Sequence, residues 1–232
     1  MIETSNHSKV FIIIPVFNEK RVIRKVIDEL LPYRYRIVVV DDGSDEDIRS
    51  EVNDLALVTY LRHKANLGQG AALQTGIEYA LQQAADYVIS FDADGQHASN
   101  DIPRMLEPLI DDSADIVLAS RFLLKGSHNA SWIRHRVLIA GRWISYLFTG
   151  IYLSDAHNGF RAMNRKAASM IRIQENRMAH ATEIIAQVKK NKLRYKEIPS
   201  TVLYTKYSLG KGQSPIQGLK IFFELVLQKL FK

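Results

Sequence analysis

The sequence carries, from residue 87 to residue 97, the segment Tyr87-Val88-Ile89-Ser90-Phe91-Asp92-Ala93-Asp94-Gly95-Gln96-His97. Its first five residues form an apolar run that predicts a buried strand. Asp92 and Asp94 follow where that strand ends, and at strand spacing their side chains leave the same face. Two neighbouring carboxylates repel each other unless a cation lies between them, and hard divalent cations take oxygen ligands. An acidic turn also explains these residues, because Asp and Gly are common in turns.

Similar apolar runs alternate with helical patterns along the chain. Strands are predicted over 10–14, 37–40, 57–61, 87–91, 115–119 and 194–198, and helices over 18–31, 71–83, 101–110, 165–173 and 182–191. Residues 155–161 are predicted to form a polar turn. Strands that alternate with helices indicate βαβ units, so the fold class is α/β, with a Rossmann-like, mostly parallel sheet flanked by helices. An amphipathic helix is predicted from residue 215 to the C-terminus.

Composition narrows the functional classes. The 232 residues include no cysteine, which excludes disulfides and thiolate metal sites. The net charge is only +6, but residues 116–154 contain no Asp or Glu while they carry five Lys or Arg residues. Such a basic segment fits an anionic partner: phosphate, lipid headgroups or nucleic acid. Nucleic acid is the weakest of these, because no OB or RRM signature accompanies the modest charge.

Polar residues follow four of the predicted strands, at 18–19, 41–42, 66–70 and 92–94. The carboxyl ends of parallel strands share one edge of a sheet, where α/β proteins bind ligands. Asp41 or Asp42 could accept from a base or a ribose hydroxyl. Gly68 could let backbone approach a ligand, or it could serve a tight turn that caps a helix. No Gly-x-Gly-x-x-Gly follows the first strand and no Walker A motif is present, which argues against a dinucleotide or P-loop site.

Six motifs occur in one order along residues 10–214: Ile14-Pro15-Val16-Phe17-Asn18-Glu19, Val40-Asp41-Asp42-Gly43-Ser44, Asn66-Leu67-Gly68-Gln69-Gly70-Ala71-Ala72, Asp92-Ala93-Asp94-Gly95-Gln96-His97, Ala119-Ser120-Arg121-Phe122 and Asp155-Ala156-His157-Asn158-Gly159-Phe160-Arg161-Ala162. In this order and spacing the chain resembles the family 2 glycosyltransferases of GT-A fold. Within that family it is most similar to the dolichyl- or polyprenyl-phosphate mannose and glucose synthases.

The resemblance implies roles on the donor side. Pro15, Asn18 and Glu19 would line a nucleoside pocket with Asp41, and Asp42 and Gly68 would lie at the same site. Asp92, Asp94 and Gln96 match the motif for the metal and the diphosphate, with Mg²⁺ or Mn²⁺ as the ion.

The resemblance also implies roles on the acceptor side. Arg121 would face the acceptor phosphate, and Asp155 and Arg161 would lie near the donor sugar and the acceptor. Arg136 would bind the lipid phosphate, although Ala140 stands where relatives usually carry Ser. Lys206 and Lys211 would close over the diphosphate, or belong to a solvated basic loop.

Some side chains keep two interpretations. Glu183 matches a position where relatives often have an acid, but a favourable charge in a helix's first turn explains it slightly better. His97, His157 and His180 are interpreted as structural or surface histidines rather than bases. The aromatic and basic residues of 132–153 are either core or a membrane interface, and the second interpretation is favoured.

The predicted enzyme is an inverting, metal-dependent hexosyltransferase. It would move a hexose from a donor of the GDP-mannose or UDP-glucose type to a polyprenyl phosphate, undecaprenyl or dolichyl, at the cytoplasmic face of the membrane. A metal at Asp92 and Asp94 would stabilise the charge of the leaving diphosphate. A lipid phosphate is already an anion, so it needs no general base.

The predicted catalytic domain spans residues 1–214, with a nucleotide-sugar half at 9–120 and an acceptor half at 121–214. Residues 215–232 are predicted to form the amphipathic helix. It would pack on the domain, on a second copy of the chain or on the membrane surface, or bind a membrane protein. Two alternatives stay open: a GT-A transferase with a glycan hydroxyl acceptor in cell-surface polysaccharide synthesis, and a non-catalytic sugar-nucleotide-binding protein.

Overall fold

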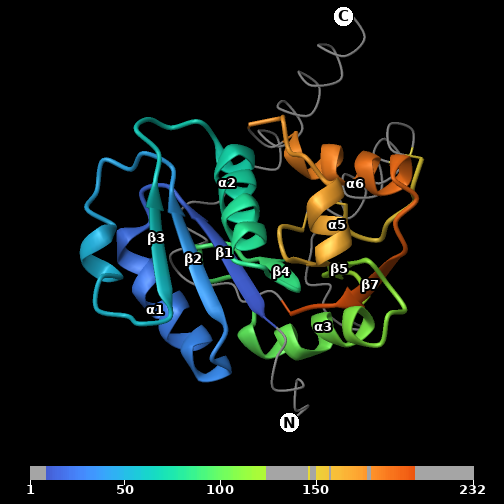
Figure 1. The fold of residues 1–232 in the computed structure, drawn as a ribbon, viewed down its shortest axis with the longest axis horizontal. Coiled ribbons are helices and arrows are strands. Elements are labelled where there is room, and N and C mark those ends of the chain that lie inside the picture. The colour runs from blue at the N-terminus through green and yellow to red at the C-terminus, as the bar shows by residue number, and fades with distance from the viewer. Residues whose placement is uncertain (1–8, 124–145, 147–149, 157, 177–178, 202–232) are drawn as a thin grey trace, which may run out of the picture.

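A computed structural model describes residues 9–123, 146, 150–156, 158–176 and 179–201 of the chain (Figure 1). The predictions for Arg136, His157, Lys206 and Lys211 lie outside the described residues. So do those for the helix at 215–232 and most of the segment 132–153. Within the described ranges, no helix has the length and apolar character needed to cross a membrane.

In the described part of the chain, seven strands form one sheet in the order β3-β2-β1-β4-β6-β5-β7 (Figure 1). They are β1 Val10–Val16, β2 Arg36–Asp41, β3 Val58–Arg62, β4 Tyr87–Ser90, β5 Ile116–Ser120, β6 Arg161–Asn164 and β7 Tyr195–Pro199. β1 pairs in parallel with β2 and β4, β2 with β3, and β5 with β7. The predicted α/β class and mostly parallel sheet are confirmed, and each predicted strand is present within two residues at either end.

β6 is a strand that the sequence did not predict. It runs antiparallel between β4 and β5, where Arg161 pairs with Ser90 on one side and with Leu118 on the other. The prediction of a polar turn over 155–161 was therefore wrong at its last residue. The strand has only four residues and begins with an arginine, so the sequence contains no apolar run that would predict it. Its first three residues are nevertheless buried.

β1 continues through Pro15, where the sequence predicted its end. The Ile13 carbonyl accepts from Phe91 on the β4 side, and Ile13 is the last β1 residue paired with β4. Two residues farther on, Pro15 faces the same side beyond the end of that ladder, so its missing N–H removes no ladder hydrogen bond.

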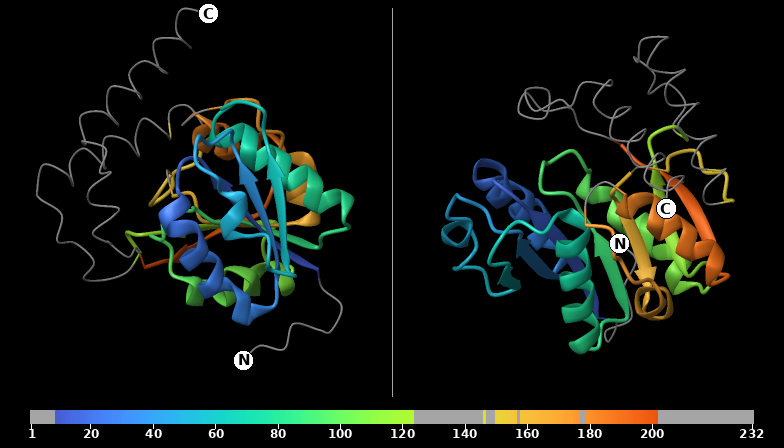
Figure 2. Two further views of the ribbon diagram at one scale, coloured as in Figure 1. Left: turned by 90° about the vertical axis from the view of Figure 1, so that its left-hand side faces the viewer. Right: turned by 90° about the horizontal axis from the view of Figure 1, so that it is seen from above.

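Helices cover both faces of the sheet, as Figures 1 and 2 show. The helices are α1 Lys20–Leu30, α2 Gln69–Gln82, α3 Ile102–Ile110, α5 Arg165–Met170 and α6 His180–Lys190, with short 3₁₀ turns at Leu31–Tyr33, Arg49–Glu51 and Ser99–Asp101. Because both faces are covered, β1 and β5 are buried along their whole length and β4 is buried at all but its first residue, which explains their continuous apolar runs.

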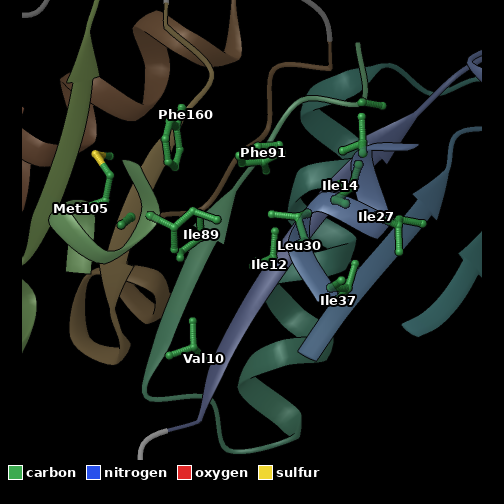
Figure 3. Close-up of a cluster of buried hydrophobic side chains, with 14 of the residues drawn as sticks. Val10, Ile12, Ile14, Ile27, Leu30, Ile37, Ile89, Phe91, Met105 and Phe160 are labelled. Atoms are coloured by element: carbon green, nitrogen blue, oxygen red, sulfur yellow. The ribbon is translucent and has the colours of Figure 1, made fainter. Parts of the chain in front are cut away.

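Successive strand residues enter opposite cores. On β1, Ile12 and Ile14 belong to the core under α1 and α3, part of which Figure 3 shows, whereas Phe11 and Ile13 belong to the core under α2, α5 and α6. Burial of side chains of this size stabilises the fold by about 1.5–3 kcal/mol each. The two cores hold the strands rigidly, so the loops at their carboxyl ends start from fixed positions.

Candidate active site

A pocket of about 500 Å³ lies at the carboxyl ends of β1, β2 and β4. Its lining comes from the loops after these strands and from the turn before α2: Pro15, Val16, Phe17, Glu19, Asp42, Asn66, Gly68, Gln69, Asp92, Ala93 and Asp94. The four polar strand ends singled out in the sequence therefore meet in space. Such a crevice is where open α/β sheets bind ligands.

Asp42 builds one wall of the pocket by holding the turn before α2. Its carboxylate accepts from the Leu67 N–H at 2.9 Å and from the Gly68 N–H at 2.7 Å. His63 Nδ1 lies 2.8 Å from the same carboxylate, and His63 Nε2 lies 2.9 Å from Thr75 Oγ1. Asp42 is buried and its hydrogen bonds are made within the protein, so its first role is to shape the turn.

Asp41 is turned away toward β3. Its fully buried carboxylate accepts from the Ser44 N–H at 2.8 Å and from the Tyr60 hydroxyl at 2.6 Å, and it lies 3.6 Å from Arg62 Nε. Burial and the bond to Asp41 raise the pKa of Tyr60 to about 12. Of the two aspartates it is thus Asp42 that lines the pocket, and the nucleoside role of Asp41 stays a prediction.

Pro15 near the end of β1 and Glu19 in the loop after it lie in the pocket wall. Asn18 adopts a left-handed backbone conformation, φ 54°, and its N–H donates to Ser44 Oγ at 2.9 Å. Its side-chain oxygen accepts from the Asp45 N–H at 2.9 Å. Asn18 therefore joins the loops after β1 and β2 and fixes where Glu19 lies.

Two side chains hold the Asp92 carboxylate in the pocket wall. Gln69 Nε2 donates to its Oδ1 at 3.0 Å, and His97 Nε2 lies 2.8 Å from its Oδ2. Burial alone would raise the pKa of Asp92, but the positive potential of His97, Arg161 and His180 outweighs it and lowers that pKa. Asp92 is therefore an anion at neutral pH, and 27% of its side chain remains exposed.

Asp94 differs from Asp92 in its surroundings. Its Oδ1 accepts from the Gln96 N–H at 2.9 Å, which closes a tight turn at Gly95, φ 71°. Burial and the nearby charge of Asp92 raise the pKa of Asp94. A cation between the two carboxylates would relieve this repulsion. The metal role predicted for the Gln96 side chain stays a prediction.

The site fits a divalent cation through two carboxylates. No three Asp, Glu, His or Cys side chains in the described part of the chain gather closely enough to form a metal cage of their own. Mg²⁺ commonly binds through one or two carboxylates together with substrate phosphates, and Asp92 with Asp94 supply that number at the pocket wall.

Gln69 is a functional candidate that sequence reasoning did not assign. It begins α2, lines the pocket and donates to Asp92. Gly68 before it has φ 101°, and a Cβ there would lie 2.0 Å from the Asn176 carbonyl oxygen. The sequence motif around Gly68 suggested a close backbone approach. The need for glycine comes from a tertiary contact with residues 174–176, which the sequence does not reveal.

Glu183 holds residues 174–176, the segment that packs on the turn before α2. Its carboxylate accepts from the Gln174 N–H at 3.0 and 3.1 Å and from the Glu175 N–H at 2.9 Å. The Asn176 carbonyl in turn accepts from the Gly70 N–H at 3.0 Å. Glu183 does lie in the first turn of α6, as expected, and its carboxylate also holds a loop against the pocket wall.

Arg121 and Asp155, predicted separately for the acceptor side, form a bidentate ion pair. Arg121 Nε donates to Oδ2 at 2.6 Å and Nη2 donates to Oδ1 at 2.8 Å. The Asp155 side chain is 3% exposed, whereas that of Arg121 is 33% exposed. Asp155 therefore orients Arg121, and part of the guanidinium side chain still faces outward.

His97 lies beside the Asp92 carboxylate, and its interpretation as a structural histidine stays a prediction. It is buried, it contacts Asp92, and its ring packs against Phe91 and Phe160 with centroids 5.3 Å apart in each case. His180 is also buried, at the start of α6.

Arg161 is the first residue of β6. The side chain is buried, and Nη1 and Nη2 have no hydrogen-bond partner among the described residues. Burial lowers the pKa of Arg161 to about 10, against the raising influence of Asp92 and Asp155. It therefore remains a cation at neutral pH.

Comparisons with known proteins agree with this geometry. Residues 11–172 match the model of Glycosyl transferase family 2. An uncharacterised protein of Methanocaldococcus jannaschii is 36% identical over 230 residues, 97% of this chain and 94% of its own length. The UDP-N-acetylglucosamine–dolichyl-phosphate N-acetylglucosaminyltransferase of Methanococcus voltae is 31% identical over 243 residues, 96% of this chain and 97% of its own length.

A solved structure shows the same fold. Glucosyl-3-phosphoglycerate synthase from Mycobacterium tuberculosis, crystallised with Mn²⁺, UDP and phosphoglyceric acid, superimposes with a TM-score of 0.67 at 15% identity. The match covers 88% of this chain and 73% of that one. The likeness is one of fold, a GT-A arrangement of sheet and helices. The family match over most of the chain and the two full-length relatives show that this protein belongs to glycosyltransferase family 2 and is a glycosyltransferase.

Proposed function

We propose that this enzyme transfers a sugar from a nucleoside-diphosphate donor to a polyprenyl phosphate of the dolichyl or undecaprenyl type. One observation carries the donor half: Asp92 and Asp94 stand on the wall of a pocket built from the loops after β1, β2 and β4. The Methanococcus voltae relative, named for transfer from a UDP-sugar to dolichyl phosphate, supports the acceptor half.

A divalent cation, Mg²⁺ or Mn²⁺, would be held by Asp92 and Asp94 together with donor phosphate oxygens. When bound, it would supply positive charge to the leaving diphosphate. Gln69 and His97 hold the Asp92 carboxylate in place, and the Asp94 turn sets the second carboxylate beside it. A preorganised site of this kind needs no rearrangement as charge develops on the leaving group.

The transfer step needs no proton movement. An oxygen of the acceptor phosphate attacks the anomeric carbon, a new carbon–oxygen bond forms, and the bond to the donor diphosphate breaks. Attack from the face opposite the leaving group inverts the anomeric configuration. Asp155 is bound to Arg121 through both of its oxygens, which fits a role in orienting a cation rather than accepting a proton.

Arg121 is the proposed contact to the acceptor phosphate. Its side chain is partly exposed, Asp155 orients it through Nε and Nη2, and a guanidinium is the side-chain cation best suited to phosphate. Arg136 and Lys211 are proposed as additional phosphate contacts from the basic, acid-free parts of the sequence. We place the enzyme peripherally on the cytoplasmic face of a membrane, because these basic segments and the amphipathic pattern of 215–232 suit an anionic lipid surface.

A donor panel tests this function. UDP- and GDP-linked sugars are incubated with undecaprenyl or dolichyl phosphate, with and without Mn²⁺, and products are identified by mass. We expect one donor to yield a lipid monophosphate sugar only when the cation is present. Transfer to a glycan hydroxyl with no lipid product would favour the hydroxyl-acceptor alternative. Nucleotide-sugar binding without any product would favour a binding protein.

A further inference from the structure

Arg161 occupies a central place between the two halves of the site. It pairs with Ser90 on β4 and with Leu118 on β5. β4 leads within two residues to Asp92, and β5 leads within three residues to Arg121, which holds Asp155. The two residues before it are bound to both neighbouring strands: Ser90 Oγ donates to the Gly159 carbonyl at 2.6 Å, and the Ala119 N–H donates to the Phe160 carbonyl.

The Arg161 side chain is a buried cation without hydrogen bonds from its terminal nitrogens. Only 2% of the residue is exposed, and Nη1 and Nη2 lack partners within the described residues. Burying a charge is costly unless other charges compensate for it. The fold brings one carboxylate near it on each side. Gly159, two residues before Arg161, packs against the Asp92 carboxylate, and Asp155 is bound by Arg121 at the end of the neighbouring strand β5. Both charges raise the pKa of Arg161 against the effect of its burial. Neither is hydrogen-bonded to it, so both interactions act through space.

We infer that Arg161 is a positioning residue whose charge is shared between Asp92 and Asp155 and couples the donor half of the site to the acceptor half. The inference rests on the proposed metal role of Asp92. The buried guanidinium would repel a divalent cation bound at Asp92, so Arg161 would weaken cation binding. With the charge of Asp92 compensated by the cation, Arg161 would interact mainly with Asp155, the carboxylate that orients Arg121.

This coupling predicts an effect of unusual sign. A residue that merely supports the fold would weaken metal binding when it is removed. Removal of the Arg161 charge should instead strengthen it, because a nearby cation has been taken away from a cation site. Arg161→Lys keeps the charge and should leave binding close to that of the wild type.

The test titrates Mn²⁺ into the full-length chain, with and without UDP, and follows free Mn²⁺ by electron paramagnetic resonance. Arg161→Met should bind Mn²⁺ about tenfold more tightly than the wild type, and Arg161→Lys should stay within about twofold. Arg161→Gln is a second neutral variant in case the Met variant does not fold. Arg165→Met is the matched control, because that exposed arginine follows the opposite end of β6 and donates to the Ala85 carbonyl.

The outcomes separate the inference from the proposed function. Unchanged or weaker Mn²⁺ binding by folded neutral variants, with binding abolished by Asp92→Asn, overturns the inference and leaves the metal role of Asp92 intact. Wild-type protein that binds no Mn²⁺, or Asp92→Asn that binds it normally, overturns the metal role and the inference together. Equal tightening by Arg161→Lys and Arg161→Met would also refute it, because then charge is not the cause.

Discussion

Gly159→Ala is the substitution that tests most sharply how the site holds Asp92. A Cβ at Gly159 would lie 2.4 Å from Asp92 Oδ2 and 2.7 Å from Oδ1. An ordinary carbon–oxygen contact is about 3.3 Å, so the carboxylate would have to move by about 1 Å. The Gly159 backbone does not have a positive φ, so alanine is allowed there and the displacement is the main consequence.

The magnitude follows from that displacement. A misplacement of about 1 Å in a preorganised site can reduce the rate about 100-fold. It would also stretch the contacts of Asp92 with Gln69 and His97, now 3.0 and 2.8 Å. The general cost of the added methyl group to stability should be about 1–3 kcal/mol, as for other overpacked sites.

The assay measures kcat/KM for sugar transfer and its dependence on Mn²⁺ concentration, with thermal unfolding recorded in parallel. Gly76→Ala is the matched control, because its Cβ would lie 2.2 Å from Ile13 in the core and disturb packing away from the pocket. We expect a large loss of activity in the first variant and a loss of stability alone in the second. If Gly159→Ala keeps wild-type activity and Mn²⁺ dependence, Asp92 does not need its observed position.

Three further predictions concern the framework of the site. Asp42→Asn replaces one of the two acceptor oxygens with an NH2 group, so either the Leu67 or the Gly68 N–H loses its acceptor. The unfolding free energy should fall by about 2 kcal/mol and the KM for the nucleotide sugar should rise. An unchanged KM would contradict the role of Asp42 in the turn. Glu183→Ala removes the acceptor of the Gln174 and Glu175 N–H groups and so releases the loop that packs on the 66–70 turn. The KM for the nucleotide sugar should rise severalfold with little change in kcat. A loss of kcat alone would contradict this role of Glu183. Asp115→Asn should lower the unfolding free energy by about 2 kcal/mol near pH 7, because the hydrogen bonds that Arg194 and Asn164 donate to this buried carboxylate lose a charged acceptor. Hydrogen bonds from Arg194 lower the pKa of Asp115, so its stabilisation is present above the usual Asp pKa of about 3.9 and is lost as the pH falls through the lowered value. Urea unfolding should therefore show the gap between Asp115→Asn and wild type narrowing in acid, and a constant gap would refute the assignment.

The sequence predicted the central sheet well for a physical reason. Strands covered on both faces need continuous apolar runs, and these stand out at 10–14, 37–40 and 87–91. Their polar carboxyl ends then pointed to one crevice, which the structure forms. β6 was not predicted, because it has only four residues, begins with Arg161 and shows neither an apolar run nor an alternating pattern. Its burial comes from the neighbouring strands.

The connections between loops could not be predicted from the sequence. Gln69 reaches Asp92, and the segment at 174–176 presses on Gly68, only because the fold brings distant loops together. Arg121 and Asp155 were each expected near the acceptor, but their pairing depends on side-chain geometry. Asp41 and Asp42 are adjacent in sequence, yet only the structure shows which one lines the pocket.

The most direct test of the central claim is sugar transfer by Asp94→Ala with the donor and lipid phosphate found in the panel, at saturating Mn²⁺. Asp94 lines the pocket and has no part in the contacts that hold Asp92, so the folded framework should survive the change. We predict that transfer is abolished while thermal unfolding remains close to that of the wild type. Full activity in this variant would contradict the assignment of the Asp92 and Asp94 pair to the metal and the donor diphosphate.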